Sequence, residues 1–244
     1  MRVRYAIISD IHGNLEALNV VLAYIDEHTI PRTICLGDVV GYGASPDECV
    51  SAIRARDIPT ILGNHDAVAC GQEEPWGFNQ LALSAVKWTT EHLSPDNLEW
   101  LKNLPLSMVC DSFLAVHATP EEGEWDYIFS WQETRPYIDK LLERNYRVCF
   151  FGHTHCPGIF TDDGVYALDE ESRFTLDPRK VYLINPGSVG QPRDDDARAS
   201  FGIFNSETEE YELVRVPYDV DAAARRIVEA GLPLFLADRL HQGH

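Results

Sequence analysis

The stretch VRYAIISDIHGN, residues 3–14, decides the class of fold. Residues 3–8 are mostly apolar and β-favouring and predict a buried strand, while Asn14 is a favourable N-cap for a helix. Apolar residues then recur at helical spacing over residues 15–25, and residues 33–36 predict the next strand. A strand–helix–strand unit of this kind indicates two parallel strands joined by a right-handed crossover.

Similar patterns continue along the chain. Further helices are predicted at 46–56, at 78–104 as a pair broken around Ser94-Pro95, at 134–143, and at 220–240 with a break at Gly231–Pro233. Further strands are predicted at 59–62, 108–110, 113–116, 147–151, 165–168, 181–184, 201–205 and 211–216, many of them joined by short polar turns. We therefore predict an α/β fold of two packed sheets flanked by helices, in a single domain over residues 1–244 that ends in C-terminal helices at 218–244.

The composition limits the classes of function. The 244 residues are 45% hydrophobic, which is enough for one large domain with a substantial core. Lys and Arg total 20 against 39 Asp and Glu, and the net charge of −19 argues against a protein that wraps nucleic acid. An anionic substrate would need a local positive charge, which bound metal ions supply.

The cysteines and the apolar segments indicate the compartment. Six cysteines contain no CxxC pair and are expected to be free thiols, namely Cys35, Cys49, Cys70, Cys110, Cys149 and Cys156. The N-terminus has too short an apolar run for a signal peptide, and no segment is long enough to span a bilayer. We expect a soluble, cytoplasmic protein with no membrane partner.

Five short polar stretches carry the candidate chemistry, and each directly follows a predicted strand. They are Asp10-Ile11-His12, Gly37-Asp38, Gly63-Asn64-His65-Asp66, His117 and Gly152-His153-Thr154-His155. Ligands of open α/β sheets bind beyond the carboxyl ends of the strands, so all five stretches are expected at one rim. The other four histidines, His28, His92, His241 and His244, lie in helical or tail contexts where solvent exposure is expected.

The spacing and the residue types suggest metal ligands. Two residues at i and i+2 share one side of an extended segment, which suits Asp10 with His12 and His153 with His155. Gly13 and Gly152 beside these pairs permit tight turns and close backbone approach. A set of imidazoles, carboxylates and one amide oxygen favours Mn, Fe, Zn or Ni over Ca or Mg.

The number of candidate ligands suggests two ions. Seven ligands are too many for one four-coordinate ion but suit two ions that share a carboxylate, an arrangement that catalyses hydrolysis at phosphorus. Taken singly, Asp10 or Asp38 after a strand is more often a turn or cap residue, and His117 a buried structural histidine. The case for metal therefore rests on the five stretches together.

The motifs SDIHGN, LGDVVGYG, LGNHD, VHAT and FGHTHCPG occur in this order between Val3 and about Gly190. They resemble the calcineurin-like metallophosphoesterase superfamily, and more narrowly its small bacterial and archaeal phosphodiesterase-like branch. The resemblance implies a four-layer α/β/β/α sandwich of two mixed sheets. It also implies that Asp10, His12, Asp38 and His155 hold one metal, that Asp38, Asn64, His117 and His153 hold the other, and that Asp38 is the bridge.

The same resemblance implies the chemistry. Two divalent transition-metal ions, Mn first and Fe, Ni or Zn next, would hold a bridging hydroxide that attacks phosphorus in line with the leaving group. His65 and Asp66 are the implied catalytic pair, with His65 approaching the phosphoryl group without binding metal and Asp66 orienting it. The predicted substrate is a small phosphodiester, with phosphomonoesters also open.

Other functions and roles stay open at this point. Alternatives are a protein phosphatase, a dinucleoside-polyphosphate phosphatase and a non-catalytic protein-binding scaffold of the same fold. A nuclease needs a basic groove, so nucleic acid beyond short oligonucleotides is not expected. Tyr42 and Arg193 are either substrate contacts or surface residues, residues 185–189 either a loop near the metals or a tight turn, and residues 78–104 either a lid or a helical layer packed on the sheet. The oligomeric state is not predicted.

Overall fold

The computed structural model describes residues 3–166, 168 and 173–244 of the chain. The helices in these residues are α1 (Leu15–Glu27), α2 (Pro46–Ala55), α3 (Asn64–Ala69), α4 (Gln80–His92), α5 (Pro95–Lys102), α6 (Trp131–Glu143), α7 (Val220–Glu229) and α8 (Leu234–Gln242). The strands are β1 (Arg4–Ile8), β2 (Arg32–Cys35), β3 (Ser107–Cys110), β4 (Phe113–Val116), β5 (Val148–Phe150), β6 (Gly158–Thr161), β7 (Gly164–Tyr166), β8 (Arg173–Thr175), β9 (Tyr182–Asn185), β10 (Ala199–Asn205) and β11 (Glu210–Val216).

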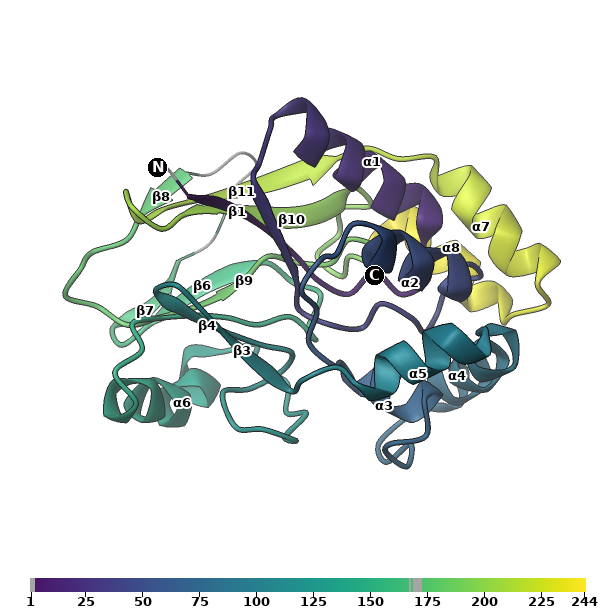
Figure 1. The fold of residues 1–244 in the computed structure, drawn as a ribbon, viewed down its shortest axis with the longest axis horizontal. Coiled ribbons are helices and arrows are strands. Elements are labelled where there is room, and N and C mark those ends of the chain that lie inside the picture. Colours follow the sequence, from purple (N-terminus) through teal and green to yellow (C-terminus); the bar gives the residue numbers. More distant parts are fainter. Residues whose placement is uncertain (1–2, 167, 169–172) are drawn as a thin grey trace.

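Two mixed sheets form the centre of the molecule (Figure 1). The first sheet has the strand order β2-β1-β10-β11-β8, and the second has the order β3-β4-β5-β9-β6-β7. The predicted strand–helix–strand unit is confirmed, because β1 pairs in parallel with β2 and α1 connects them. The Asn14 side chain caps α1 by accepting a hydrogen bond from the Ala17 amide at 3.1 Å.

The alternation of side chains along β1 separates two of the layers. Tyr5 and Ile7 pack in the cluster between the two sheets, whereas Ala6 and Ile8 face the helical layer that contains α1. All four side chains are at most 2% exposed. A strand buried on both faces has apolar residues at successive positions, which explains the unbroken run YAII.

The second sheet shows the same arrangement from the other side. Phe113 and Ala115 of β4 point between the sheets, while Leu114 and Val116 pack against Ile138 and other residues of α6. In Figure 1, α6 lies against the second sheet, and α1 and α7 lie on the side of the first sheet. The predicted four-layer α/β/β/α sandwich is therefore confirmed.

The structure corrects several predicted elements. Residues 59–62 form only an isolated bridge from Thr60 to Cys35, because Pro59 has no amide hydrogen to donate and the chain turns into α3 at Gly63. The sequence interpretation missed the short elements α3, β6 and β8. The predicted strand at 165–168 corresponds in part to β7, and Ala167 lies outside the described residues.

The two predicted helical pairs are present. The segment 78–104 divides into α4 and α5 at the expected break, and these helices pack against α2 and α3, with Val86 and Leu101 in the same buried cluster as Ile8 of β1. The C-terminal segment divides into α7 and α8, which join α4 in a cluster of buried side chains that includes Tyr42. None of the helices in the described part of the chain is both long and apolar enough to cross a bilayer. All six cysteines are free thiols.

Candidate metal centre

The seven predicted ligands gather at one rim of the sheets. Four of the loops that carry them follow β1, β2, β4 and β5, whereas Asn64 lies at the first turn of the short helix α3 and not after a strand. Each is at most 7% exposed, and the set is Asp10, His12, Asp38, Asn64, His117, His153 and His155. The four histidines outside the predicted motifs, His28, His92, His241 and His244, are exposed, as expected.

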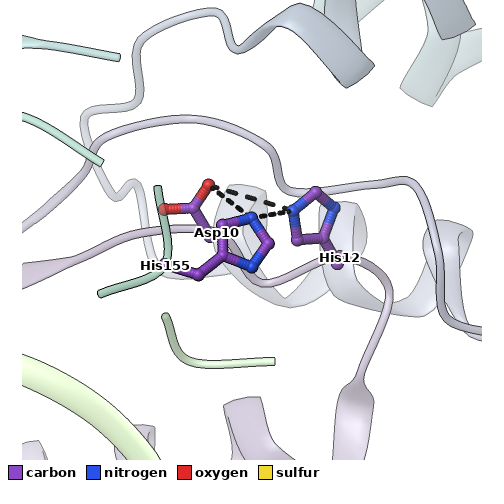
Figure 2. Close-up of side chains that lie close together, drawn as sticks. All are labelled: Asp10, His12 and His155. Atoms are coloured by element: carbon purple, nitrogen blue, oxygen red, sulfur yellow. Dashed lines mark hydrogen bonds and ion pairs between the residues drawn. The ribbon is translucent and has the colours of Figure 1, made fainter. Parts of the chain in front are cut away.

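One cluster consists of Asp10, His12 and His155. Their ligand atoms lie within 4.8 Å of one another, and Figure 2 shows the carboxylate and the two rings turned toward a common point. Asp10 Oδ1 lies 3.4 Å from His155 Nε2 and 3.8 Å from His12 Nε2. The other oxygen of Asp10 accepts a hydrogen bond from Ser9 Oγ at 2.6 Å, which fixes the orientation of the carboxylate.

A second cluster consists of Asp38, His117 and His153, with Asn64 beside them. The ligand atoms of the first three residues again lie within 4.8 Å of one another. His117 Nε2 lies 3.4 Å from Asp38 Oδ2 and 3.2 Å from the amide oxygen of Asn64. The two histidines of the HxH motif thus contribute to different clusters, His153 to this one and His155 to the first.

Asp38 connects the two clusters. Its Oδ2 atom lies 3.4 Å from His117 Nε2 and 3.6 Å from His12 Nε2, so one carboxylate oxygen faces both groups. Its Oδ1 atom accepts a hydrogen bond from the His65 amide at 2.8 Å. The first turn of α3 therefore fixes the orientation of the Asp38 carboxylate.

Backbone carbonyls select which nitrogen of each histidine is free. Nδ1 of His12, His117 and His155 lies 3.1, 2.8 and 2.6 Å from the carbonyl oxygens of Val40, Leu36 and Gln191. Because a carbonyl only accepts, Nδ1 carries the proton and Nε2 presents its lone pair to the site. His153 is reversed, since its Nε2 lies 3.0 Å from the Trp125 carbonyl oxygen, which leaves Nδ1 as the free atom.

The backbone at these residues is not extended. Asp10, His12, Asp38, His153 and His155 all have positive φ, between 49° and 65°. The interpretation of the two i, i+2 pairs as ends of extended strands is therefore wrong, because the chain curls as soon as each strand ends. This conformation costs non-glycine residues about 1–3 kcal/mol each and concentrates at functional sites, and Asp and His tolerate it better than most residues.

The surroundings of the site keep three of the histidines neutral and Asp38 ionised, which are their ligand forms, whereas His117 differs. Burial lowers the pKa of His153 to about 3 and holds the pKa of His12 and His155 well below the usual value, so all three are neutral at pH 7. Burial opposes the ionised form of Asp38, but the nearby imidazoles of His117 and His65 outweigh it and hold the pKa of that carboxyl well below its usual range. Burial lowers the pKa of His117, but Asp38 outweighs this effect and raises it to about 9, so without a metal ion this ring is a cation paired with Asp38.

The implied catalytic pair has an unexpected geometry. The His65 ring is buried between other rings, at 4.9 Å from His12 and 4.6 Å from Phe78 between centroids, and its Nδ1 is buried without a hydrogen-bond partner. Asp66 is fully buried, but its oxygens accept hydrogen bonds from the Val40 and Gly63 amides at 3.1 and 3.2 Å. Among the described hydrogen bonds Asp66 does not contact the His65 ring, so Asp66 positions the backbone and does not orient His65 directly.

Gly152 and the segment 185–189 pack against the loops that carry the two clusters. Gly152 is needed for close packing, since a Cβ atom there would lie 2.0 Å from Ser9 Oγ and 2.6 Å from Asp10 Oδ2. In the segment 185–189, Asn185 donates to the Gly152 carbonyl at 2.7 Å and Ser188 Oγ donates to the Asp10 carbonyl at 2.7 Å. This segment therefore braces the loops that carry both clusters and is more than a turn between strands.

The sequence interpretation considered Trp76 only as part of a possible lid and did not predict an aromatic groove at the site. A groove of about 520 Å³ opens beside Asn64 and His153 and is lined by the aromatic side chains of Trp76, Phe78, Trp125 and Tyr127. The ring of Tyr127 stacks on His153 at 4.2 Å between centroids. The aromatic residues around 76–78 and 125–129 are the signal in the sequence for this groove. Tyr42, which was not assigned from the sequence, is buried against His12 and His65 at 4.8 and 4.6 Å between centroids.

Comparison with known proteins agrees with this geometry. Residues 3–209 match the calcineurin-like phosphoesterase superfamily domain. An uncharacterized protein of Methanocaldococcus jannaschii is 42% identical over 244 aligned residues, which cover 98% of this chain and 97% of the relative. The crystal structure of a metallophosphoesterase from Sphaerobacter thermophilus matches 100% of both chains with 34% identity and a TM-score of 0.88. A symmetrical bis(5'-nucleosyl)-tetraphosphatase of a Janthinobacterium species is 29% identical over 119 residues, 46% of this chain and 42% of that protein. The chain belongs to the calcineurin-like phosphoesterase superfamily.

Proposed function

We propose that the protein is a metal-dependent phosphoesterase that hydrolyses small phosphodiesters. The observation that carries this proposal is the position of Asp38, whose Oδ2 atom faces His12 Nε2 at 3.6 Å and His117 Nε2 at 3.4 Å. A carboxylate shared by two clusters of ligands is the arrangement that two adjacent metal ions require. The family implies divalent metal ions, and the donors of this chain fit them.

The fit rests on the chemistry of the donors. The clusters combine imidazoles, carboxylates and one amide oxygen without a thiolate, a set suited to Mn, Fe, Ni or Zn, of which we expect Mn. Asp10, His12, Asp38 and His155 would hold one ion, and Asp38, Asn64, His117 and His153 the other. Two divalent ions bound here would lower the pKa of a water molecule between them and neutralise the oxygens of the phosphoryl group.

His65 is the proposed catalytic residue. Burial lowers the pKa of its imidazole to about 4, so the ring is neutral at pH 7 and can donate one N–H hydrogen bond to a phosphoryl oxygen. An anionic phosphoryl group beside the ring raises this pKa and so favours the protonated ring, which can then donate a proton to the departing oxygen. Asp66 contributes by holding the Val40 and Gly63 amides, and thereby the loop that carries Asp38.

The aromatic groove supports a substrate with an organic group on both sides of the phosphorus. It begins at Asn64 and His153, within the proposed metal centre, and Trp76 at its edge is 88% exposed. Aromatic walls of this kind bind planar rings by stacking. A phosphodiester can place in the groove the ester group that does not depart. A small monoester has only the departing group and cannot use the groove in this way.

Dinucleoside polyphosphates are the second candidate substrates, because the Janthinobacterium relative is named for that activity. The alternative of a protein-binding scaffold has no use for a buried imidazole such as His65 with an unpartnered Nδ1. A nuclease acting on long nucleic acid remains disfavoured by the net charge of −19. We also retain cytoplasmic location and a single domain as predictions.

The test of this proposal is a screen of metals against substrates. Hydrolysis of bis(4-nitrophenyl) phosphate and of 4-nitrophenyl phosphate would be measured with Mn, Ni, Fe, Co, Zn and Mg. We expect activity that a chelator abolishes, with the diester preferred. His65→Ala should lose turnover while elemental analysis shows unchanged metal content. Turnover that survives complete removal of metal would contradict the proposal.

A further inference from the structure

Two arginine side chains lie next to the proposed metal centre, on the ring of Tyr42. Cζ of Arg193 lies 5.6 Å from the centroid of that ring and Cζ of Arg239 lies 5.8 Å from it. Tyr42 itself packs against His12 and His65. The two guanidinium groups are therefore one aromatic ring away from the cluster that contains His12.

Arg193 is anchored to the first cluster through its backbone and side chain. Its amide donates a hydrogen bond to the His155 carbonyl at 3.3 Å, and its guanidinium donates to Gln191 Oε1 at 3.0 Å. The backbone carbonyl of the same Gln191 accepts from the His155 ring at 2.6 Å. Nε of Arg193 is buried without a hydrogen-bond partner.

Arg239 reaches the same aromatic ring, that of Tyr42, from helix α8. Its Nε donates to the backbone oxygen of His244, and its guanidinium also lies 5.8 Å from the Phe235 ring. Among the described residues, no Asp or Glu side chain forms an ion pair with Arg193 or Arg239. The neighbouring acidic side chains Asp194 and Asp196 pair with Arg215 and Arg198.

This arrangement is unfavourable without an anion. Both guanidinium groups lie on the Tyr42 ring, and burial, together with the charge of Arg193, lowers the pKa of Arg239 to about 10. In a chain with 39 acidic and 20 basic residues, carboxylates were available to neutralise them. Partly desolvated guanidinium groups with unused N–H donors bind phosphoryl oxygens through strong, charge-assisted hydrogen bonds.

We propose that Arg193 and Arg239 form a subsite for a second phosphoryl group of the substrate, adjacent to the phosphoryl group that is hydrolysed. This inference rests on the proposed function and names the substrate class as esters of diphosphate or longer phosphate chains. Arg193, which contacts the first cluster, binds the part of the phosphate chain nearer to the metal centre. Arg239 binds the part farther from it. The match to the family domain covers residues 3–209, so Arg239 in α8 lies outside the matched residues.

Two substrates with the same leaving group test the subsite. The first is the 4-nitrophenyl ester of thymidine 5'-monophosphate, and the second is the 4-nitrophenyl ester of thymidine 5'-diphosphate. In both, the oxygen of water bonds to the phosphorus that carries the 4-nitrophenyl group, the bond to 4-nitrophenolate breaks, and the proton of water goes to solvent. The second substrate differs by one added phosphoryl group next to the reacting one.

The variants are Arg239→Gln and Arg239→Lys, with Arg225→Gln on the exposed face of α7 as a control for the loss of one charge. We expect the wild type to prefer the diphosphate ester in kcat/KM. Arg239→Gln should lower kcat/KM for that ester by about 10- to 100-fold, the range for losing a hydrogen bond to a charged group. The monophosphate ester should change less than about twofold, Arg239→Lys should recover part of the loss because a cation is retained, and Arg225→Gln should behave as wild type.

The possible results distinguish a failure of the proposed subsite from a failure of the proposed function. Metal-dependent hydrolysis of both esters with equal effects of Arg239→Gln on each would overturn the subsite and leave the proposed function intact. Hydrolysis of neither ester would count against the proposed function. Calorimetric titration with α,β-methylene-ADP then decides the subsite, because weaker binding to Arg239→Gln than to Arg225→Gln supports it and equal binding overturns it.

Discussion

His12 Nε2 and His155 Nε2 lie 3.0 Å apart, although 143 residues separate them in the chain. In each ring Nδ1 donates to a backbone carbonyl, so the two Nε2 atoms face each other with their lone pairs. Two lone pairs at this distance repel unless a proton or a cation lies between them. Asp10 Oδ1, at 3.4 Å from His155 Nε2, adds a negative charge that favours a cation at the same point.

This relationship predicts that metal stabilises the fold. Addition of Mn to chelator-treated protein should raise the melting temperature, and a ligand at about 100 times its Kd contributes about 2.7 kcal/mol to the free energy of unfolding. The measurement is thermal unfolding with excess Mn or with EDTA. His155→Gln should lose most of the increase, whereas His241→Gln, at an exposed histidine, should keep it. An equal increase in both variants would contradict the assignment of His155.

Close packing behind the first cluster predicts a specific destabilisation. Gly152→Ala places a Cβ 2.0 Å from Ser9 Oγ and should lower the free energy of unfolding by about 1–3 kcal/mol, as overpacking does. Ser9→Ala removes the oxygen in that contact, so the double variant should be more stable than the sum of the two single changes by about 1 kcal/mol. Urea unfolding of the four proteins measures this coupling, and strict additivity would show that the contact with Ser9 is not the cause.

The sequence predicted much of the fold because the strands are short apolar runs bounded by turn residues. β1 and β4 are buried on both faces, and such strands have apolar residues at nearly every position. The short elements α3 and β8 were missed, since Asn64–Ala69 carries a candidate ligand motif and no helical repeat, and β8 is only three residues long. Those elements depend on contacts distant in sequence more than on local pattern.

The candidate ligands were found from their types and order, but their geometry was not. The left-handed conformation of Asp10 or His153 depends on loops that close against each other, such as the Asp10 carboxylate accepting from the His153 amide at 3.1 Å. Arg239 was missed for a different reason. It lies 46 residues after Arg193, in a helix that reads as an ordinary amphipathic segment, and only the packing of α8 brings it to Tyr42.

The aromatic groove predicts a change in substrate binding without a change in chemistry. Trp76→Ala should raise KM for bis(4-nitrophenyl) phosphate about fivefold, because one ring–ring contact contributes on the order of 1 kcal/mol, and should leave kcat unchanged. Its stability should also be unchanged, since the side chain is 88% exposed. Val109→Ala, at another exposed apolar side chain, is the matched control. A fall in kcat with constant KM would place Trp76 outside the binding surface.

The buried His65 predicts a pH dependence of the chelator-treated protein. Burial lowers the pKa of His65 to about 4, below the value near 6.5 of an unfolded chain, so below pH 6.5 the unfolded state binds more protons. The stability associated with neutral His65 is present above pH 6.5 and is lost as the pH falls to about 4, by up to about 3 kcal/mol.

Urea unfolding between pH 7 and pH 4 measures this effect against His65→Phe, which does not titrate. The free energy of unfolding of the wild type should decline more steeply than that of the variant. Parallel curves would show that His65 is not held neutral by burial.

The central claim is that Asp38 bridges two metal ions and that the histidines of the HxH motif divide between them. The most direct measurement is an anomalous difference map from crystals of the Mn-loaded protein. We predict two peaks about 3.5–4 Å apart, one on each side of the Asp38 carboxylate, with His155 beside one and His153 beside the other. A single peak bound by both histidines, or two peaks without Asp38 between them, would contradict the claim.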